Sequence, residues 1–280
     1  MSFRDIFLTA ASHLHGAAMN FLPTPSNYIV LTLHNIASHQ ESSFASIIGY
    51  INNKYGFIEP KKFSPQDIWL PETPRILLTF DDGFLSNRKM AESVLMPLGI
   101  CAVFFPTYEF IGLDSKNSFD FASRYFYPRR SVSLEDGDLS SMSWADLSWL
   151  LSQGHEIGAH TLTHRALSGL SSREKRIEII DGADQLEQKL GVRVEKFAYP
   201  FGSLSTVDEE SIEIARSRFK FAFSNIRGNL VDSPSHHFIW RQNLSLGITV
   251  HQVDGVINGL LDWPYRRQRQ SARLRFGMKK

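Results

Sequence analysis

Short apolar runs alternate along the chain with longer stretches in which apolar residues recur every three to four positions. The short runs are rich in β-branched and aromatic residues and predict strands at residues 28–33, 76–80, 101–106, 155–160, 196–199, 221–224 and near 239–246. The longer stretches predict helices at residues 43–54, 87–98, 144–153 and 171–190. Strands that alternate with helices indicate an α/β fold with a parallel sheet or barrel.

Capping residues mark the ends of two of these helices. Ser143 is placed to cap the third helix, and Gly154 follows its last residue. Ser171 with Glu174 three residues later matches a capping box, and Gly191 closes the helix that it starts. Two independent signals therefore agree on these boundaries.

The remaining stretches define the expected organisation. Residues 114–142 are polar without a clear period, so we expect a long inserted loop. Residues 3–21 include an amphipathic pattern, which predicts a helix packed on the domain in preference to one lying on a membrane. We expect a single domain over residues 1–280, with its core at about 28–261 and a basic tail at 264–280.

Composition narrows the cellular setting. The chain has 280 residues, 42% of them hydrophobic, and a net charge of +1, so no global field favours nucleic acid and no such partner is expected. The single cysteine, Cys101, excludes a disulfide within the chain and fits a reducing compartment. We find neither a signal-peptide pattern nor an apolar run of roughly eighteen residues, and we expect a cytoplasmic protein.

The C-terminus departs from this neutral balance. Residues 266–280 carry seven basic residues and no acidic one. Such a segment can contact an anionic membrane surface, here the inner face of the membrane. A solvated, partly frayed terminus is the alternative.

Polar residues follow several of the predicted strands. Asp81 and Asp82 end one strand, and His160 ends another, with His164 four residues later. In parallel α/β folds the carboxyl ends of strands carry the active residues. Adjacent residues of an extended chain point to opposite sides, so one Asp can bind a metal while its neighbour stays free as a base. The alternatives are an ordinary Asp-Gly turn and hydrogen-bonded core histidines.

A third segment, Phe197-Ala198-Tyr199-Pro200-Phe201-Gly202, runs from a strand into a turn. It is either a turn with an aromatic lid or a site that aims a backbone N–H at a developing oxyanion.

Together, Thr79-Phe80-Asp81-Asp82-Gly83, His160-Thr161-Leu162-Thr163-His164 and this third segment resemble the first three motifs of the polysaccharide deacetylases. These are the carbohydrate esterase family 4 enzymes, which share the NodB homology domain. The resemblance covers roughly residues 28–261. It implies a distorted (β/α) barrel and a cell-surface glycan or its precursor as substrate.

By motif position, the resemblance implies that Asp82, His160 and His164 bind one divalent metal ion, most commonly zinc, with Co²⁺, Ni²⁺ or Mn²⁺ as alternatives. Asp81 would be the general base. The metal would polarise the acetamide carbonyl and lower the pKa of a bound water.

The Tyr199 backbone N–H would help to hold the oxyanion, and Pro200 and Phe201 would contact the substrate. The sequence departs from the family in two places. The arginine of the third motif is missing, and Arg241 is a candidate to pair with the base, with a plain surface arginine as the alternative. No late Leu-X-His motif is present, and His251 is the nearest candidate for the general acid.

The resemblance thus implies a hydrolase that removes N-acetyl groups from amino sugars. An O-acetyl esterase or a sugar-lipid deformylase could use the same site. A non-catalytic domain that binds glycan or scaffolds other proteins is the alternative from another class.

Overall fold

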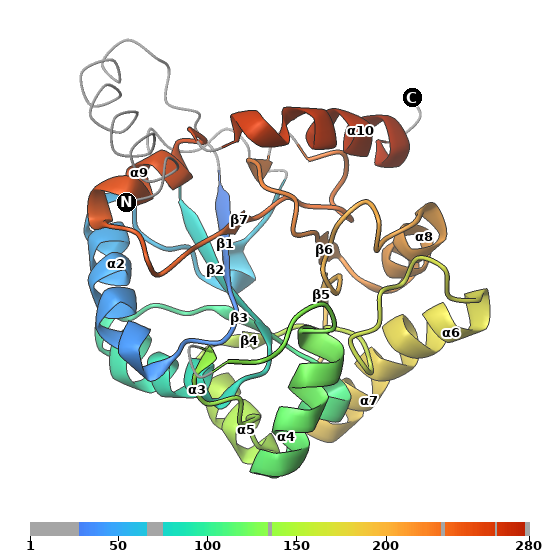
Figure 1. The fold of residues 1–280 in the computed structure, drawn as a ribbon, viewed down its shortest axis with the longest axis horizontal. Helices are drawn as coiled ribbons and strands as arrows, with labels where there is room; N and C mark the ends of the chain where they lie inside the picture. Colours follow the sequence, from blue (N-terminus) through green and yellow to red (C-terminus); the bar gives the residue numbers. More distant parts are fainter. Residues whose placement is uncertain (1–27, 66–74, 134–135, 231–232, 261, 278–280) are drawn as a thin grey trace.

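The computed structural model describes residues 28–65, 75–133, 136–230, 233–260 and 262–277. Its strands lie at the centre, surrounded by helices (Figure 1). The strands are β1 Ile29–Leu33, β2 Ile76–Asp82, β3 Val103–Pro106, β4 Glu156–Ile157, β5 Lys196–Ala198, β6 Phe221–Phe223 and β7 Gln242–Asn243. The helices are α2 Glu41–Lys54, α3 Leu85–Met90, α4 Ser115–Phe121, α5 Trp144–Ser152, α6 Ser172–Arg176, α7 Gly182–Leu190, α8 Glu209–Arg218, α9 Val250–Ile257 and α10 Arg266–Phe276.

All paired strands run parallel, in a five-stranded sheet of order β4-β3-β2-β1-β7 and a two-stranded sheet β5-β6. Two single bridges link the sheets, Ala159 with Phe197 of β5 and Ile239 with Phe223 of β6. Because β7 follows Ile239 closely and pairs with β1, the strands surround a common interior. The fold is the expected distorted (β/α) barrel, with a hydrogen-bonded ladder that is not continuous around it.

Alternate residues of the strands face two apolar layers. Leu78 and Phe80 of β2 pack outward in one cluster with Phe44 of α2. Leu77 points the other way and packs with Val30 of β1 in the barrel interior. Such two-sided burial is expected for a parallel sheet covered by helices.

The helix boundaries read from the sequence are confirmed. The Ser143 side chain accepts a hydrogen bond from the Asp146 N–H, and the two residues form a capping box at the start of α5. Ser171 and Glu174 form the capping box of α6, and a π-helical turn at Ile177–Asp181 joins α6 to α7 without a break. The cap of α7 at Gly191 is left-handed, as its position after the last turn requires.

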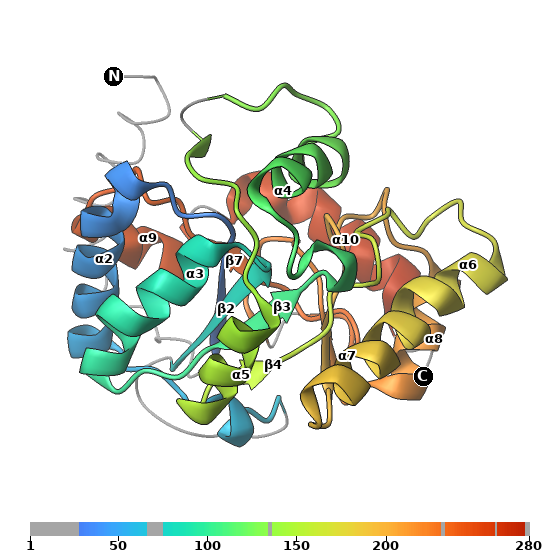
Figure 2. The ribbon, with the colours of Figure 1, turned by 90° about the horizontal axis from the view of Figure 1, so that it is seen from below.

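The expectation of an irregular loop at residues 114–142 is wrong in part. The Asp114 carboxylate caps α4 by accepting from the Asn117 N–H at 2.8 Å, and a π-helical turn, Ala122–Phe126, continues the helix. Aromatic side chains from both pieces join a separate apolar cluster. Figure 2 shows α4 as a layer above α3 and α5 in that view.

The basic C-terminus is also more ordered than a frayed tail. Residues 266–276 form α10, whose Ala272 and Phe276 are buried and whose Phe276 ring lies 4.6 Å from that of Phe238. The spacing of these two residues by four places them on the same face of the helix. The N-terminal helix expected at residues 3–21 lies outside the described residues.

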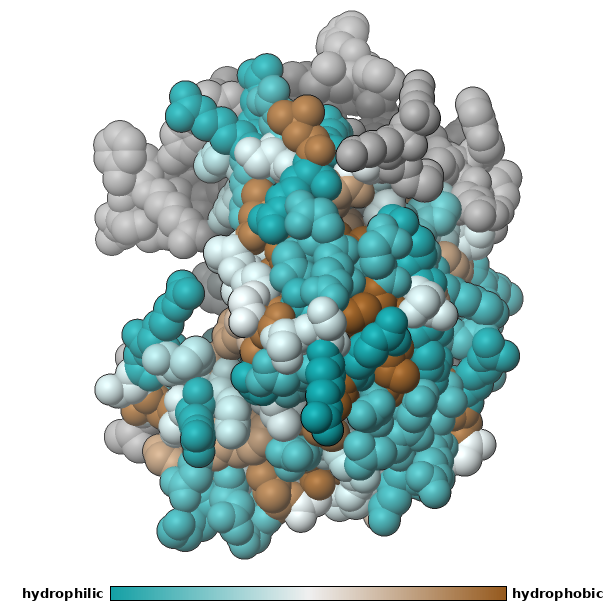
Figure 3. All heavy atoms as spheres, turned by 90° about the vertical axis from the view of Figure 1, so that its right-hand side faces the viewer, coloured by the Kyte–Doolittle hydropathy of each residue, from teal (hydrophilic) through white to brown (hydrophobic). Residues whose placement is uncertain are grey.

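The surface offers no broad apolar face on the side that Figure 3 displays, which is mainly hydrophilic with scattered apolar side chains. Among the described residues, no helix combines the length and apolar character needed to cross a membrane.

Candidate metal centre

Strand β2 delivers two carboxylates to the same end of the barrel. The alternation along the strand puts Asp81 on the interior side with Leu77. At Asp82 the backbone turns into the left-handed region, with φ 74°. Gly83 follows at φ 103°, where an added Cβ would lie 2.7 Å from the Ile111 side chain. The turn therefore redirects Asp82 away from the face that holds Asp81.

Asp81 is bound on both oxygens by Arg241. The Nη1–Oδ1 distance is 2.8 Å, the Nη2–Oδ2 distance is 2.6 Å, and both side chains are buried. Arg241 Nε also donates to the Ser224 carbonyl at 2.8 Å, and Nη1 reaches Thr79 Oγ1 at 3.3 Å. The sequence left Arg241 open between this pairing and a surface position, and the structure places it in the barrel.

The surroundings keep Asp81 ionised. Burial alone would raise the pKa of Asp81, but the charge of Arg241, with a contribution from His160, holds this pKa well below its usual range. The carboxylate is thus fixed in orientation and remains a proton acceptor throughout the neutral pH range.

His160 and His164 aim the same ring atom at Asp82. His160 Nδ1 donates to the Ala198 carbonyl at 2.7 Å, and His164 Nδ1 donates to the Tyr125 carbonyl at 3.1 Å. A carbonyl can only accept, so each Nδ1 carries a proton, and the Nε2 of each neutral ring presents a lone pair. The two Nε2 atoms lie 3.5 and 3.4 Å from Asp82 Oδ1.

These three residues fit a cation. Their ligand atoms all lie within 4.8 Å of one another, and all three side chains are buried. Asp82 Oδ1 has no hydrogen-bond donor, although it is fully buried. An unsatisfied carboxylate oxygen facing two imidazole lone pairs is the donor set that a divalent metal with an open coordination position uses.

Protonation equilibria follow the same arrangement. Burial lowers the pKa of His164 to about 3, so this ring stays neutral. Burial would also lower the pKa of His160, but the carboxylates of Asp82 and Asp81 outweigh it and raise this pKa above its ordinary value. The cluster therefore attracts positive charge, and a metal ion would compete with a proton at His160.

The loop that joins the two histidines is clamped by a buried glutamate. The Glu178 carboxylate accepts from the Thr163 N–H at 2.9 Å and from the Thr163 hydroxyl, and the Glu178 carbonyl accepts from the Leu162 N–H at 3.0 Å. Glu178 belongs to the π-helical turn between α6 and α7. Gly182, one turn later, lies so close that an added Cβ would be 2.8 Å from Leu162 N.

Unfavourable backbone conformations concentrate at this site. Among the described residues, the non-glycine positions with positive φ are Asp82, Thr161, His164 and Phe201. Two are candidate metal ligands, and Thr161 Oγ1 accepts from the His164 N–H at 2.9 Å. Strain of this kind persists only where the surrounding structure enforces it.

The third motif contributes differently from what the sequence suggested. The Tyr199 N–H donates to the Phe223 carbonyl at 3.0 Å, and the Tyr199 hydroxyl donates to the His237 carbonyl at 2.8 Å. The expected oxyanion role is wrong for this structure, because strand pairing already uses that N–H. Pro200 is buried, whereas the Phe201 ring packs edge-on against His164 with centroids 4.7 Å apart.

A histidine that the sequence did not single out lies at the site instead. His34 follows β1, the neighbour of β2, and its Nε2 is 3.9 Å from Asp81 Oδ2. Its side chain is 35% exposed, so it can reach a bound molecule. Its place after a central strand was the available signal.

The expected acid, His251, lies in the first turn of α9, and its side chain is outside the described part. The Tyr50 hydroxyl of α2 donates a hydrogen bond to Asp254 of α9. This helix therefore packs against α2 on the outside of the barrel.

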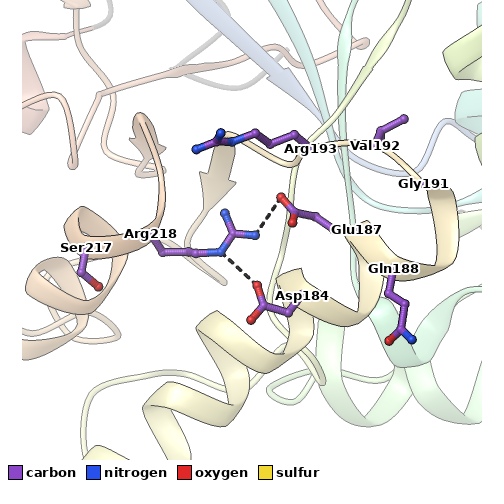
Figure 4. Close-up of a pocket in the computed structure, with 8 residues that line it drawn as sticks. All are labelled: Asp184, Glu187, Gln188, Gly191, Val192, Arg193, Ser217 and Arg218. Carbon is purple, nitrogen blue, oxygen red and sulfur yellow. Dashed lines mark hydrogen bonds and ion pairs between the residues drawn. The ribbon is translucent and has the colours of Figure 1, made fainter.

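The other end of the strands holds a hollow of about 740 Å³. It lies where α7 and α8 lead into β5 and β6, and Arg218 spans it to Asp184 and Glu187 (Figure 4). Arg218 is neutralised by these two carboxylates, Arg193 pairs with Glu195 outside the lining, and the hollow lacks the histidines of the cluster. In the part of the chain that the structure describes, the cluster of metal ligands thus lies at the carboxyl ends of the strands.

Comparison with known proteins agrees with this placement. Residues 71–218 match the family model described as polysaccharide deacetylase. No match is found among curated proteins.

Several solved structures share the fold. The deacetylase PplD of Streptococcus pyogenes, in complex with acetate, is 16% identical with a TM-score of 0.66, covering 84% of this chain and 99% of that chain. IcaB from Ammonifex degensii is 22% identical with a TM-score of 0.65, covering 83% and 97%. A de-N-acetylase from Aggregatibacter actinomycetemcomitans is 13% identical with a TM-score of 0.62, covering 82% and 99%.

Proposed function

The chain belongs to the polysaccharide deacetylase family, hydrolases that act on amide bonds, and from this premise we propose that it removes the N-acetyl group from an amino sugar of a glycan or glycan precursor. The observation that carries the proposal is the pair of adjacent carboxylates. Asp82 faces two imidazole lone pairs without a donor, while Asp81 is ionised and held by Arg241.

Enzymes of this family depend on a metal ion. Asp82, His160 and His164 would hold it, and zinc suits two imidazoles and a carboxylate. When bound, the metal would polarise the amide carbonyl and increase the acidity of water.

Asp81 then accepts a proton from the attacking water. Its position is fixed by the two Arg241 hydrogen bonds, so the carboxylate is oriented before the substrate arrives. As the water oxygen bonds to the carbonyl carbon, negative charge moves to the carbonyl oxygen, and the carbon–nitrogen bond becomes the bond to break.

The leaving nitrogen needs a proton, and His34 is the candidate donor. It is partly exposed at the mouth of the barrel, next to the carboxylate that took the proton from water. Imidazole exchanges protons readily near neutral pH. Transfer from His34 to the nitrogen releases the free amine, with acetate as the other product.

The test compares two histidine variants of the metal-loaded protein on N-acetylhexosamine oligomers, with acetate release as the readout. His34→Gln is expected to lower kcat by about 10²–10⁴-fold, the usual contribution of proton transfer. His251→Gln, which alters the residue suggested by the sequence, is expected to keep kcat within about twofold of wild type. Both variants should retain the metal.

A larger loss in His251→Gln than in His34→Gln would reverse the assignment of the acid. Acetate release from O-acetylated sugars but not from N-acetylated ones would identify an esterase. A protein that binds metal but releases acetate from neither would support the non-catalytic alternative.

We further propose that α10 brings the protein to the inner face of the membrane. It carries arginines and no acidic residue, and Leu274 on it is 82% exposed. Co-sedimentation with anionic vesicles, but not with neutral ones, is the expected result.

A further inference from the structure

A second cavity lies beside the candidate metal centre. It has a volume of about 380 Å³, within the range of small-molecule sites. One wall comes from residues 126–130 of the 114–142 insertion, and the other from Phe201, Ser203, Ser205 and Thr206. Two segments far apart in the sequence thus enclose it, and we call it the side cavity.

The side cavity shares its inner wall with the metal centre. The rings of Phe126 and Phe201 both line it, and both pack edge-on against His164 with centroids 4.7 Å apart. A molecule that reaches the metal centre can therefore place its next unit here.

The charge of the lining is one-sided. Arg129 and Arg130 are its charged residues, and no carboxylate lines it. Arg130 is neutralised by Asp136, which accepts from both terminal nitrogens. Arg129 is exposed and has no hydrogen-bond or ion-pair partner among the described residues. Within the described part of the chain, the side cavity thus holds one positive charge, that of Arg129, without a counter-charge.

The remaining walls suit a sugar. Phe126, Tyr127 and Phe201 supply aromatic surface, and the hydroxyls of Ser203 and Ser205, 2.9 Å apart, lie on the same wall as Phe201. Aromatic surface packs against the apolar face of a pyranose, and hydroxyls exchange hydrogen bonds with its oxygens. A neutral sugar would use these walls but would leave Arg129 unused.

We propose that the side cavity binds an acidic unit of the substrate, a sugar carrying a carboxylate or phosphate next to the acetamido sugar, with Arg129 as its ionic partner. The inference rests on the proposed deacetylation and names its substrate class. It distinguishes the substrate from a neutral polymer of N-acetylhexosamine alone. The shared chemistry is an oxyanion within reach of one guanidinium, which a uronic acid or a sugar phosphate supplies.

The experiment uses the metal-loaded full chain and three probes. They are N-acetylchitotetraose as the neutral probe, a tetrasaccharide of alternating N-acetylglucosamine and glucuronic acid as the carboxylate probe, and UDP-N-acetylglucosamine as the phosphate probe. Acetate release gives kcat and KM, and calorimetry gives the affinity of each probe. The two acidic probes separate the two sources of the oxyanion.

For wild type, at least one acidic probe should exceed the neutral probe in kcat/KM by about tenfold or more. Arg129→Ala should remove this advantage by raising KM about 10- to 100-fold for that probe, the range for a hydrogen bond to a charged group. Its kcat/KM on the neutral probe should stay within about twofold. Arg124→Ala is the matched control, because Arg124 is also exposed on the insertion but does not line the side cavity.

Equal kcat/KM on neutral and acidic probes in wild type, or an Arg129→Ala loss that is the same on all probes, would overturn the subsite while leaving deacetylation intact. Binding of an acidic probe that depends on Arg129, without acetate release from any probe, would keep the subsite and remove the proposed function. Neither binding nor release would remove both.

Discussion

Asp81 and Asp82 are adjacent in the chain but belong to two differently built regions. The first region lies in the barrel interior, where Arg241 satisfies both oxygens of Asp81. The second lies where β2 ends, and there Asp82 Oδ1 faces the loop residues His160 and His164 without a donor. The difference shows that a single backbone turn separates a carboxylate whose oxygens both accept hydrogen bonds from one with an oxygen that accepts none. The first is the candidate base, and the second is the candidate metal ligand.

The largest effect on activity should come from a substitution in the second region. His160→Ala removes one of three ligands, so the protein should bind less than one metal per chain and acetate release should fall to background. Metal content by mass spectrometry and an acetate assay check this. The matched control is His155→Ala, because His155 is a buried histidine whose Nδ1 accepts from the Ala102 N–H, away from the cluster. Full activity in His160→Ala would remove the metal assignment.

A substitution in the barrel interior should lower activity without loss of the metal. Asp81→Asn should lower kcat by about 10²–10⁴-fold while metal content stays at one per chain. It also leaves the buried Arg241 without its counter-charge, which should cost about 3 kcal/mol of unfolding free energy. Denaturant unfolding and metal analysis on the same preparation separate the two losses.

A second substitution isolates the structural part of that loss. Asp81→Asn combined with Arg241→Met should recover much of the stability, because the uncompensated charge is gone, but none of the activity. Recovery of activity in the double variant would show that Asp81 serves only to neutralise Arg241.

A smaller effect should follow from the clamp on the histidine loop. Glu178→Gln keeps the size of the side chain but weakens its hold on Thr163, so metal affinity should fall about 10–100-fold. Saturating metal should restore most of kcat, which a direct catalytic role would not allow. Glu174→Gln, in the exposed capping box of α6, is the control.

The smallest effect concerns acid stability of the metal-free protein. The folded pKa of Asp81 is depressed, so its contribution is fully present above the unfolded pKa of about 4 and is lost as pH falls toward the folded value. Between pH 5.5 and 3, wild type should therefore lose more unfolding free energy than Asp81→Asn. Parallel curves for the two proteins would show that Asp81 is not held ionised by folding.

Local patterns made much of this molecule predictable. The strand before Asp81 is an apolar run interrupted only by Thr79, and the helix caps at Ser143 and Ser171 need only neighbouring residues. The clustering of Asp82 with the histidines followed from strand ends meeting at one edge of the barrel.

The features that the sequence left open or missed involve long-range contacts or weak local signals. Arg241 lies 160 residues after Asp81, so their pairing depends on how the barrel comes together. His34 is a single histidine outside the three motifs, so the sequence offered little reason to assign it to the site. The α4 helix has a polar sequence, and only its Asp114 cap distinguished it from a loop.

The left-handed residues at the site bear on attempts to make this protein more durable. Each costs about 1–3 kcal/mol, and four together are comparable to the 5–15 kcal/mol that keeps a typical protein folded. An engineer who selects for heat tolerance alone would be drawn to glycine at Thr161 or Phe201, since it relieves the strain. Glycine at Thr161 would remove the hydroxyl that holds His164, and glycine at Phe201 would remove the ring that packs on His164, so shelf life and turnover should be screened together.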